Sequence, residues 1–209
     1  MAQFIAGIEV PDTAAATEAS ALVTDPLIYH HSRRIFLFSE LQAQRLDLKP
    51  DPELLYLAAM FHDAGLLTPF SDAEQRFELD GADHARDFLQ ARGFSAAESE
   101  TVWTAVAMHT TPGIAVRMGP EAAALHLGVL TEMYGLGLDR LDGERIREIV
   151  EAHPRGDFPN EFFRLMIDGL RNRPATVRGT VWSDVLEHFL PGYERSDLVA
   201  GMLAAPWQR

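Results

Sequence analysis

The pair His62-Asp63 points most directly to chemistry in this sequence. It ends an apolar segment, residues 54–65, with the sequence LLYLAAMFHDAG. A histidine and a carboxylate are costly to bury unless another group pairs with them, and a divalent cation pairs with both. Neighbouring helical residues point about 100° apart, so both can reach one ion only near a helix end. Gly65 supplies that end, and the pair therefore predicts a metal site. The plainer alternative is an aspartate that only caps the helix.

Two other segments direct a histidine toward the core. His31 lies on the apolar stripe of the segment after Asp25, and His109 lies on the stripe of the segment after Ser95. A single inward histidine is more often a hydrogen-bonded core residue than a ligand. Several buried imidazoles and carboxylates in one small bundle, however, cost much free energy unless they share a cation. We therefore expect His31, His62 and Asp63 to bind a metal ion.

Two acidic residues are candidates for a further ligand. Glu132 interrupts an otherwise apolar row, so a buried Glu132 needs a cation or strong hydrogen-bond donors. We predict that Glu132 is a metal ligand, and pairing with an arginine is the alternative. Asp184 is the fallback ligand, although it could equally form a local ion pair with His188 one turn away.

Helix signals recur along the whole chain, and the alternation typical of β-hairpins does not. Asp25-Pro26 starts one helix, and Ser95 with Glu98 forms a capping box for another. The fold class expected is all-α, with residues 25–209 as a single helical domain. Residues 1–24 are expected to be an arm or a short helix. We expect helices over residues 26–46, after Pro52 to about 62, from 80 to Gly93, and over 95–110, 120–134, 143–152, 160–172, 180–189 and 196–204.

Composition limits the function classes. The 209 residues are 47% hydrophobic, which is enough for one substantial core. A formal charge of −13 repels polyanions, so nucleic acid is not an expected partner. The chain has no cysteine, so a metal site must use nitrogen and oxygen ligands. No leader or bilayer-spanning segment is visible, so we expect a cytoplasmic protein with no membrane partner and a small-molecule substrate, with a homo-oligomer left open.

At these residues the chain resembles the HD-domain superfamily of metal-dependent hydrolases, named for a His…His-Asp…Asp pattern on a helical bundle. His31 stands in the first position and His62-Asp63 in the second. Three further stretches, RFELDGA at 76–82, WTAVAMHTTPG at 103–113 and SDVLEHF at 183–189, resemble cyanamide-hydratase-like HD proteins. Where the pattern has a final aspartate, this chain carries Glu132, whose extra methylene moves the oxygens outward.

The resemblance implies a single-domain HD-type helical bundle with one or two divalent metal ions. Zinc or iron is expected, with manganese, cobalt or nickel as alternatives. Metal-activated water would add to, or hydrolyse, a small polar molecule with a nitrile-like group, such as cyanamide. His109 and His84 are the expected catalytic residues and would relay protons. Some members of the superfamily use two further histidines for a second ion, and Asp63 would then bridge the pair.

Three other functions are left open by the sequence. A phosphohydrolase acting on a nucleotide or phosphomonoester would need phosphate-binding groups, but no Gly-rich loop is present and the net charge opposes capture. A di-metal HD oxygenase is the second alternative. The third is a degenerate HD bundle that binds a ligand or a partner without catalysis and keeps its histidines only as core residues.

Overall fold

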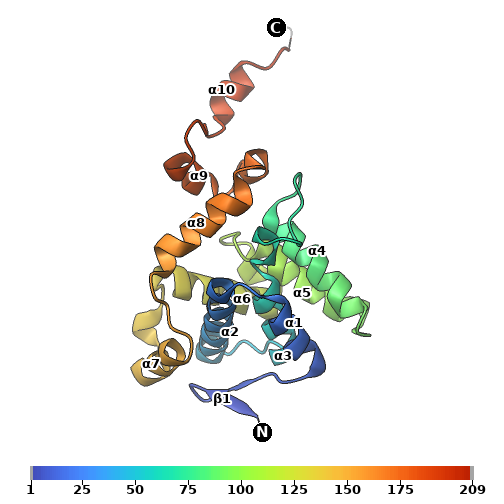
Figure 1. Cartoon of the computed structure of the whole chain (residues 1–209), viewed down its shortest axis with the longest axis vertical. Helices are drawn as coiled ribbons and strands as arrows, with labels where there is room; N and C mark the ends of the chain where they lie inside the picture. Colours follow the sequence, from blue (N-terminus) through green and yellow to red (C-terminus); the bar gives the residue numbers. More distant parts are fainter. Residues whose placement is uncertain (1, 208–209) are drawn as a thin grey trace.

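Helices carry nearly all of the regular structure (Figure 1). A computed structural model describes residues 2–207. The helices are α1 (Ala14–Leu22), α2 (Pro26–Leu46), α3 (Pro52–Phe61), α4 (Phe77–Gln90), α5 (Ala96–Met108), α6 (Pro120–Tyr134), α7 (Gly143–Ala152), α8 (Phe158–Leu170), α9 (Ser183–Phe189) and α10 (Leu198–Leu203). Short 3₁₀ helices are η1 (Ala64–Leu66), η2 (Ala115–Arg117), η3 (Leu138–Arg140) and η4 (Pro174–Val177). The all-α prediction is confirmed.

Side-chain caps explain why the helices begin where the sequence indicates. The Asp25 carboxylate accepts hydrogen bonds from the first backbone amides of α2, and Asp51 does the same for α3. A proline follows each cap, in the first turn where its missing N–H costs nothing. Ser95 and Glu98 form the predicted capping box at the start of α5. These local signals make the helix boundaries readable from the sequence.

The first residues contain a β-hairpin that the sequence did not predict. Strands β1 (Gln3–Ile5) and β2 (Ile8–Val10) pair antiparallel through a turn in which Ala6 and Gly7 have φ of 53° and 70°. Three-residue strands are too short to show an alternating pattern, so the expectation of no hairpin was wrong. Helix α1 follows and packs on α3. Residue 1 and residues 208–209, at the outer ends of the two predicted ranges, lie outside the described part.

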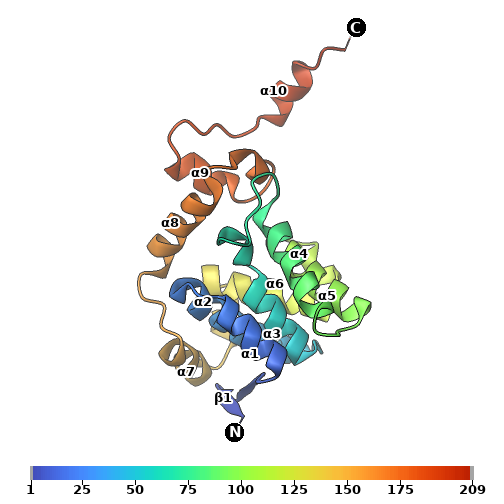
Figure 2. The same ribbon diagram turned by 45° about the vertical axis from the view of Figure 1, so that its right-hand side comes forward.

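The core forms around α2, α3 and α6. Helices α2 and α6 pack along each other, and α4 and α5 form a second pair against α3 (Figure 1). From residue 54 to its end, α3 is buried on every face, which matches its continuous apolar sequence. From α7 the chain passes through α8 and α9 along the outside of this body (Figure 2). The inward histidines therefore lie on or directly after helices of this body: His31 on α2, His62 after α3 and His109 after α5.

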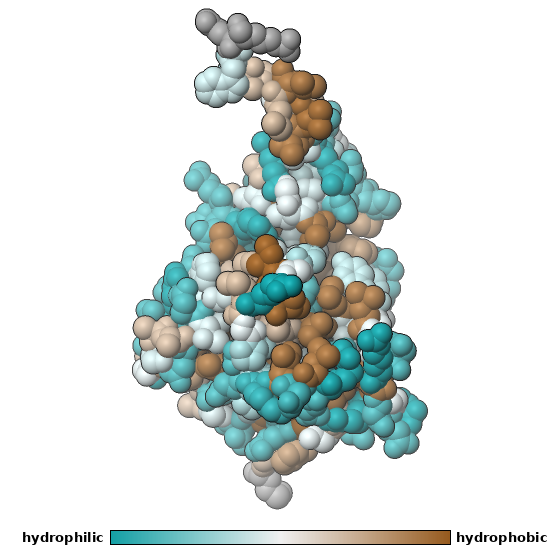
Figure 3. All heavy atoms as spheres, turned by 180° about the vertical axis from the view of Figure 1, so that it is seen from behind, coloured by the Kyte–Doolittle hydropathy of each residue, from teal (hydrophilic) through white to brown (hydrophobic). Residues whose placement is uncertain are grey.

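Helix α10 projects away from the body at the end opposite the N-terminus (Figures 1 and 2). Its apolar side chains form a hydrophobic segment exposed to solvent (Figure 3). These residues are Leu198, Val199, Met202 and Leu203. Across residues 2–207, no helix is both long enough and apolar enough to span a bilayer.

The contact between α2 and α6 depends on Gly128. A Cβ at this position would overlap Ser39 Oγ and the Ile35 carbonyl oxygen of α2. We expect Gly128→Ala to lower the free energy of unfolding by about 1–3 kcal/mol, because either helix must shift. Chemical denaturation measures the change. The control Gly143→Ala, at the start of α7, meets no atom within 4 Å and should stay within about 0.5 kcal/mol of wild type. Equal stability of the two variants would contradict the close approach.

Candidate metal centre

Three predicted ligands meet at one point. The Nε2 atoms of His31 and His62 lie 3.3 Å apart. Asp63 Oδ2 is 3.4 Å from the first and 3.1 Å from the second. All three side chains are at most 2% exposed. Residues from α2 and from the end of α3 therefore converge on one buried focus, and among residues 2–207 this is the group of three whose spacing suits a metal ion.

Helix ends fix the orientation of two histidines near this focus. His62 follows the last residue of α3, and its Nδ1 donates to the Ala59 carbonyl at 2.8 Å. His109 follows the last residue of α5, and its Nδ1 donates to the Val106 carbonyl at 2.6 Å. A carbonyl oxygen can only accept, so each Nδ1 carries the hydrogen of the neutral ring. Both Nε2 atoms consequently present a lone pair.

The lone pair of His62 Nε2 faces another acceptor, the carboxylate of Asp63. Buried Asp63 Oδ2 has no hydrogen-bond partner, although two imidazole nitrogens lie within 3.4 Å of it. Two acceptors that face each other in a buried site are unfavourable unless a proton or a cation lies between them. Ligands about 2.1 Å from an ion stand about 3.0–3.4 Å from one another, and the three separations match those values. The residues present therefore fit a divalent cation.

The electrostatics favour an ionised Asp63 and a neutral His62, as metal binding requires, and a protonated His31. Burial raises the pKa of Asp63, but the three imidazoles around it, His62 first, bring that pKa well below its usual value. Burial lowers the pKa of His62. Burial also lowers the pKa of His31, but Glu132 and Asp63 outweigh this effect and raise that pKa overall. Without a metal, the focus thus draws a proton to His31, and a cation binding there would replace that proton.

His109 stands beside the three-residue group. Its Nε2 lies 3.6 Å from the other carboxylate oxygen of Asp63, Oδ1. Its ring meets the His62 ring edge-on, with centroids 5.1 Å apart. At 1% exposure His109 is as buried as the ligands themselves. The position suits a proton relay next to the centre, and it also suits a ligand for a second ion bridged by Asp63.

Glu132 lies at the opposite edge of the His31 ring. Its Oε2 is 3.3 Å from His31 Nδ1, a close contact that does not form a full hydrogen bond. Its Oε1 accepts from Arg34 Nε at 2.8 Å and from Arg155 Nη1 at 2.9 Å. Burial raises the pKa of Glu132, but His31, Arg34 and Arg155 outweigh it and lower the pKa to about 2. The arginine pairing foreseen as an alternative is present, and direct ligation by Glu132 stays a prediction.

Close packing by α4 sets the position of the His62-Asp63 turn. Gly81 of α4 lies against the carbonyl oxygens of Phe61 and His62, where a Cβ would overlap the Phe61 oxygen. A larger residue would push α4 away from the end of α3. Gly81 belongs to the stretch 76–82, so that part of the resemblance to HD proteins maps onto the support of the centre.

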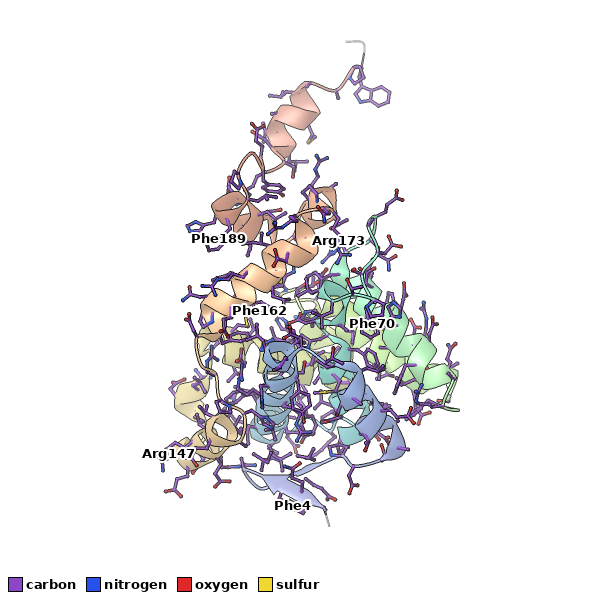
Figure 4. The ribbon with its side chains drawn as sticks, in the orientation of Figure 1. Phe4, Phe70, Arg147, Phe162, Arg173 and Phe189 are labelled. Carbon is purple, nitrogen blue, oxygen red and sulfur yellow. The ribbon has the colours of Figure 1, made fainter. Side chains whose placement is uncertain are left out.

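Arg173 holds the segment that follows the turn (Figure 4). Its Nη2 donates to the Gly65 carbonyl at 2.6 Å. Its Nη1 donates to the carbonyls of Asp72 and Gln75 and to the Asp80 carboxylate. The guanidinium thus connects residues 65–80 to the end of α8. These contacts give Arg173 a structural role, because they hold the segment that follows His62-Asp63 in place.

Two of the predicted site residues lie away from the focus. His84 is exposed on α4, and its ring meets the edge of Phe70 with centroids 5.0 Å apart. Asp184 is exposed on α9 and pairs with Arg195 at 2.8 Å. His84 occupies the border of the apolar face of α4, where a small rotation decides between core and solvent. Its catalytic role and the fallback role of Asp184 have no contact with the focus to support them.

Sequence analysis missed two residues near the centre. His126 of α6 lies one turn from buried Ala122, and its Nδ1 is 2.7 Å from the His109 carbonyl. Its helical spacing could have identified it as an inward residue. Arg155 lies in an irregular segment between α7 and α8, where no periodicity indicates a direction. Only the folded chain shows that it reaches Glu132.

A comparison with models of known protein families shows which family this chain belongs to. The HD domain family matches residues 28–181. The chain belongs to the HD-domain family. The match includes His31, His62, Asp63, His109 and Glu132. HD domains are generally metal-dependent hydrolases, and the buried His, His and Asp of this chain are compatible with metal binding. No curated protein matches the chain.

The arrangement around Glu132 gives a test of its role. If Glu132 only orients His31, Glu132→Gln should still bind the same number of metal ions, with an affinity about 10–100-fold lower. Isothermal titration with Zn²⁺ and Co²⁺ measures both quantities. The matched control is Glu121→Gln, a buried glutamate of the same helix that accepts from the Asp51 amide. Complete loss of binding in a folded Glu132→Gln protein would identify Glu132 as a direct ligand.

Proposed function

We propose that this HD-domain protein is a metal-dependent hydrolase or hydratase acting on a small polar molecule. In the proposal, His31, His62 and Asp63 bind one divalent ion. The observation that supports it most is the orphaned Asp63 oxygen facing two imidazole nitrogens in a buried focus. Two nitrogen ligands and one oxygen ligand suit zinc or iron, and manganese, cobalt or nickel can also accept them.

The chemistry divides between the cation and the side chains around it. A divalent cation at this site supplies Lewis-acid chemistry and makes water nucleophilic near neutral pH. Glu132 orients His31 through its Nδ1 edge. His109 Nε2 carries a lone pair, so this atom can take a proton from water and return it to the leaving or accepting atom of the substrate. Phe158 and Phe162 pack against the His31 ring and exclude bulk water on that side.

For the substrate we propose a molecule with a nitrile-like group, such as cyanamide. The support is the resemblance to cyanamide-hydratase-like HD proteins. Two of the resembling stretches meet at Glu78, a buried residue of α4 that accepts from Thr110 Oγ1 at 2.7 Å. Trp182, which immediately precedes the third stretch, donates to the same carboxylate at 3.1 Å. The resembling stretches thus come together on the His109 side of the centre.

Removal of a ligand tests the metal site. We expect His62→Ala to lose its metal after gel filtration, because one of three ligands and its lone pair are gone. Elemental analysis of the purified protein measures the content. His84→Ala is the control and should keep the wild-type content, since His84 is exposed on α4. If His62→Ala binds metal as well as wild type does, the proposed centre is wrong.

Substitution of His109 separates a proton relay from a metal ligand. In the one-ion proposal, His109→Gln retains its metal and loses about 100-fold to 10,000-fold in kcat, because proton transfer is lost. Assays with cyanamide, other nitriles, amides and p-nitrophenyl phosphate give the rate, and elemental analysis gives the stoichiometry. Two ions per chain in wild type and one in His109→Gln would contradict the one-ion proposal and favour a bridged pair.

A further inference from the structure

A pocket of about 350 Å³ lies beside the metal centre. We call it the α8 pocket. Its walls are mainly apolar, from Phe158, Phe162 and Phe163 of α8 and from Val181, Trp182 and Val185. The pocket is far larger than cyanamide, which has three non-hydrogen atoms. A molecule that filled it would therefore carry a substantial apolar group.

The α8 pocket and the centre share an aromatic wall. Phe158 stacks on the His31 ring with centroids 4.6 Å apart, and Phe162 lies 5.3 Å from the same ring. Both phenylalanines also line the pocket, and Figure 4 labels Phe162 on α8. On the His109 side, Trp182 lines the pocket and packs on Phe77, whose ring meets His109. One layer of aromatic side chains thus separates the pocket from the buried focus.

Arg155 gives the α8 pocket one positive group. Its Nη1 is occupied by the Glu132 carbonyl and carboxylate. Within residues 2–207, its Nε and Nη2 have no hydrogen-bond partner, and its side chain is 31% exposed. The guanidinium lies over the Phe158 ring at 5.3 Å, so it is held against the apolar wall. The acidic residue of the lining, Asp184, already pairs with Arg195.

We propose that the α8 pocket binds a small organic monoanion, with a flat apolar body and one carboxylate that pairs with Arg155. The proposal goes beyond the proposed hydrolase function, because it assigns a ligand class to a pocket that a layer of aromatic side chains separates from the metal centre. A single charge is favoured because one guanidinium, already shared with Glu132, receives it. The net charge of −13 opposes a more highly charged ligand.

Benzoate and benzamide provide the probe pair, because they have the same shape and differ in charge. Isothermal titration uses full-length protein from which metal has been removed with a chelator, so that benzoate cannot bind a metal ion. We expect benzoate to bind about tenfold more tightly than benzamide, through its charge-assisted hydrogen bonds. Arg155→Gln should remove this preference and leave benzamide binding unchanged.

A second variant avoids the contact between Arg155 and Glu132. Val181 lines the pocket and is 45% exposed, so Val181→Asp adds a negative charge without disturbing the core. It should weaken benzoate at least about fivefold and benzamide much less. The control is Val116→Asp in η2, a residue of matched exposure, 43%, outside the pocket lining.

Three results would overturn the proposal. They are equal affinity for benzoate and benzamide, unchanged benzoate binding in Val181→Asp, and tighter binding of phenyl phosphate than of benzoate. Because the titration needs neither metal nor turnover, its failure is distinct from failure of the hydrolase proposal. A protein that binds benzoate as expected but lacks metal would retain the pocket assignment and lose the proposed activity.

Discussion

The centre depends on one electrostatic constraint, the meeting of imidazole lone pairs and a carboxylate inside a dry core. A histidine directly follows each of the helices α3 and α5, and the Nδ1 of each ring donates to a carbonyl of the last turn. Turning either ring would break that hydrogen bond, so the lone pairs cannot easily turn away from Asp63. The helix ends therefore create both the order of the site and its demand for positive charge.

A buried charge network supports this constraint from behind. Glu132 of α6 pairs with Arg34 of α2 and with Arg155, and Arg34 Nη1 also donates to the carbonyls of His153 and Pro154. Loss of Glu132 would leave the buried Arg34 without its carboxylate, and breaking a buried ion pair typically costs about 3–5 kcal/mol. The network thus fixes the His31 edge of the centre and the start of α8 together.

Sequence could predict what local chemistry determines. Caps and prolines gave most helix boundaries, and helical spacing placed His31 and His109 inside. The sequence determines less well where a side chain at the border of an apolar helix face points. It therefore could not show that His84 of α4 is exposed to solvent. Partners far apart in sequence were beyond prediction, because the pairing of Glu132 with Arg155 depends on an irregular segment. The hairpin was not predicted because its strands are only three residues long, too short to show an alternating pattern.

The aromatic cover over His31 has a kinetic consequence. Phe158 and Phe162 lie between His31 and the α8 pocket, and both belong to one helix at the edge of the body. An ion held beneath them could escape to solvent on that side only after α8 lifts. Its exchange with a competing chelator would then follow the opening rate of this helix, and strong retention need not mean strong coordination.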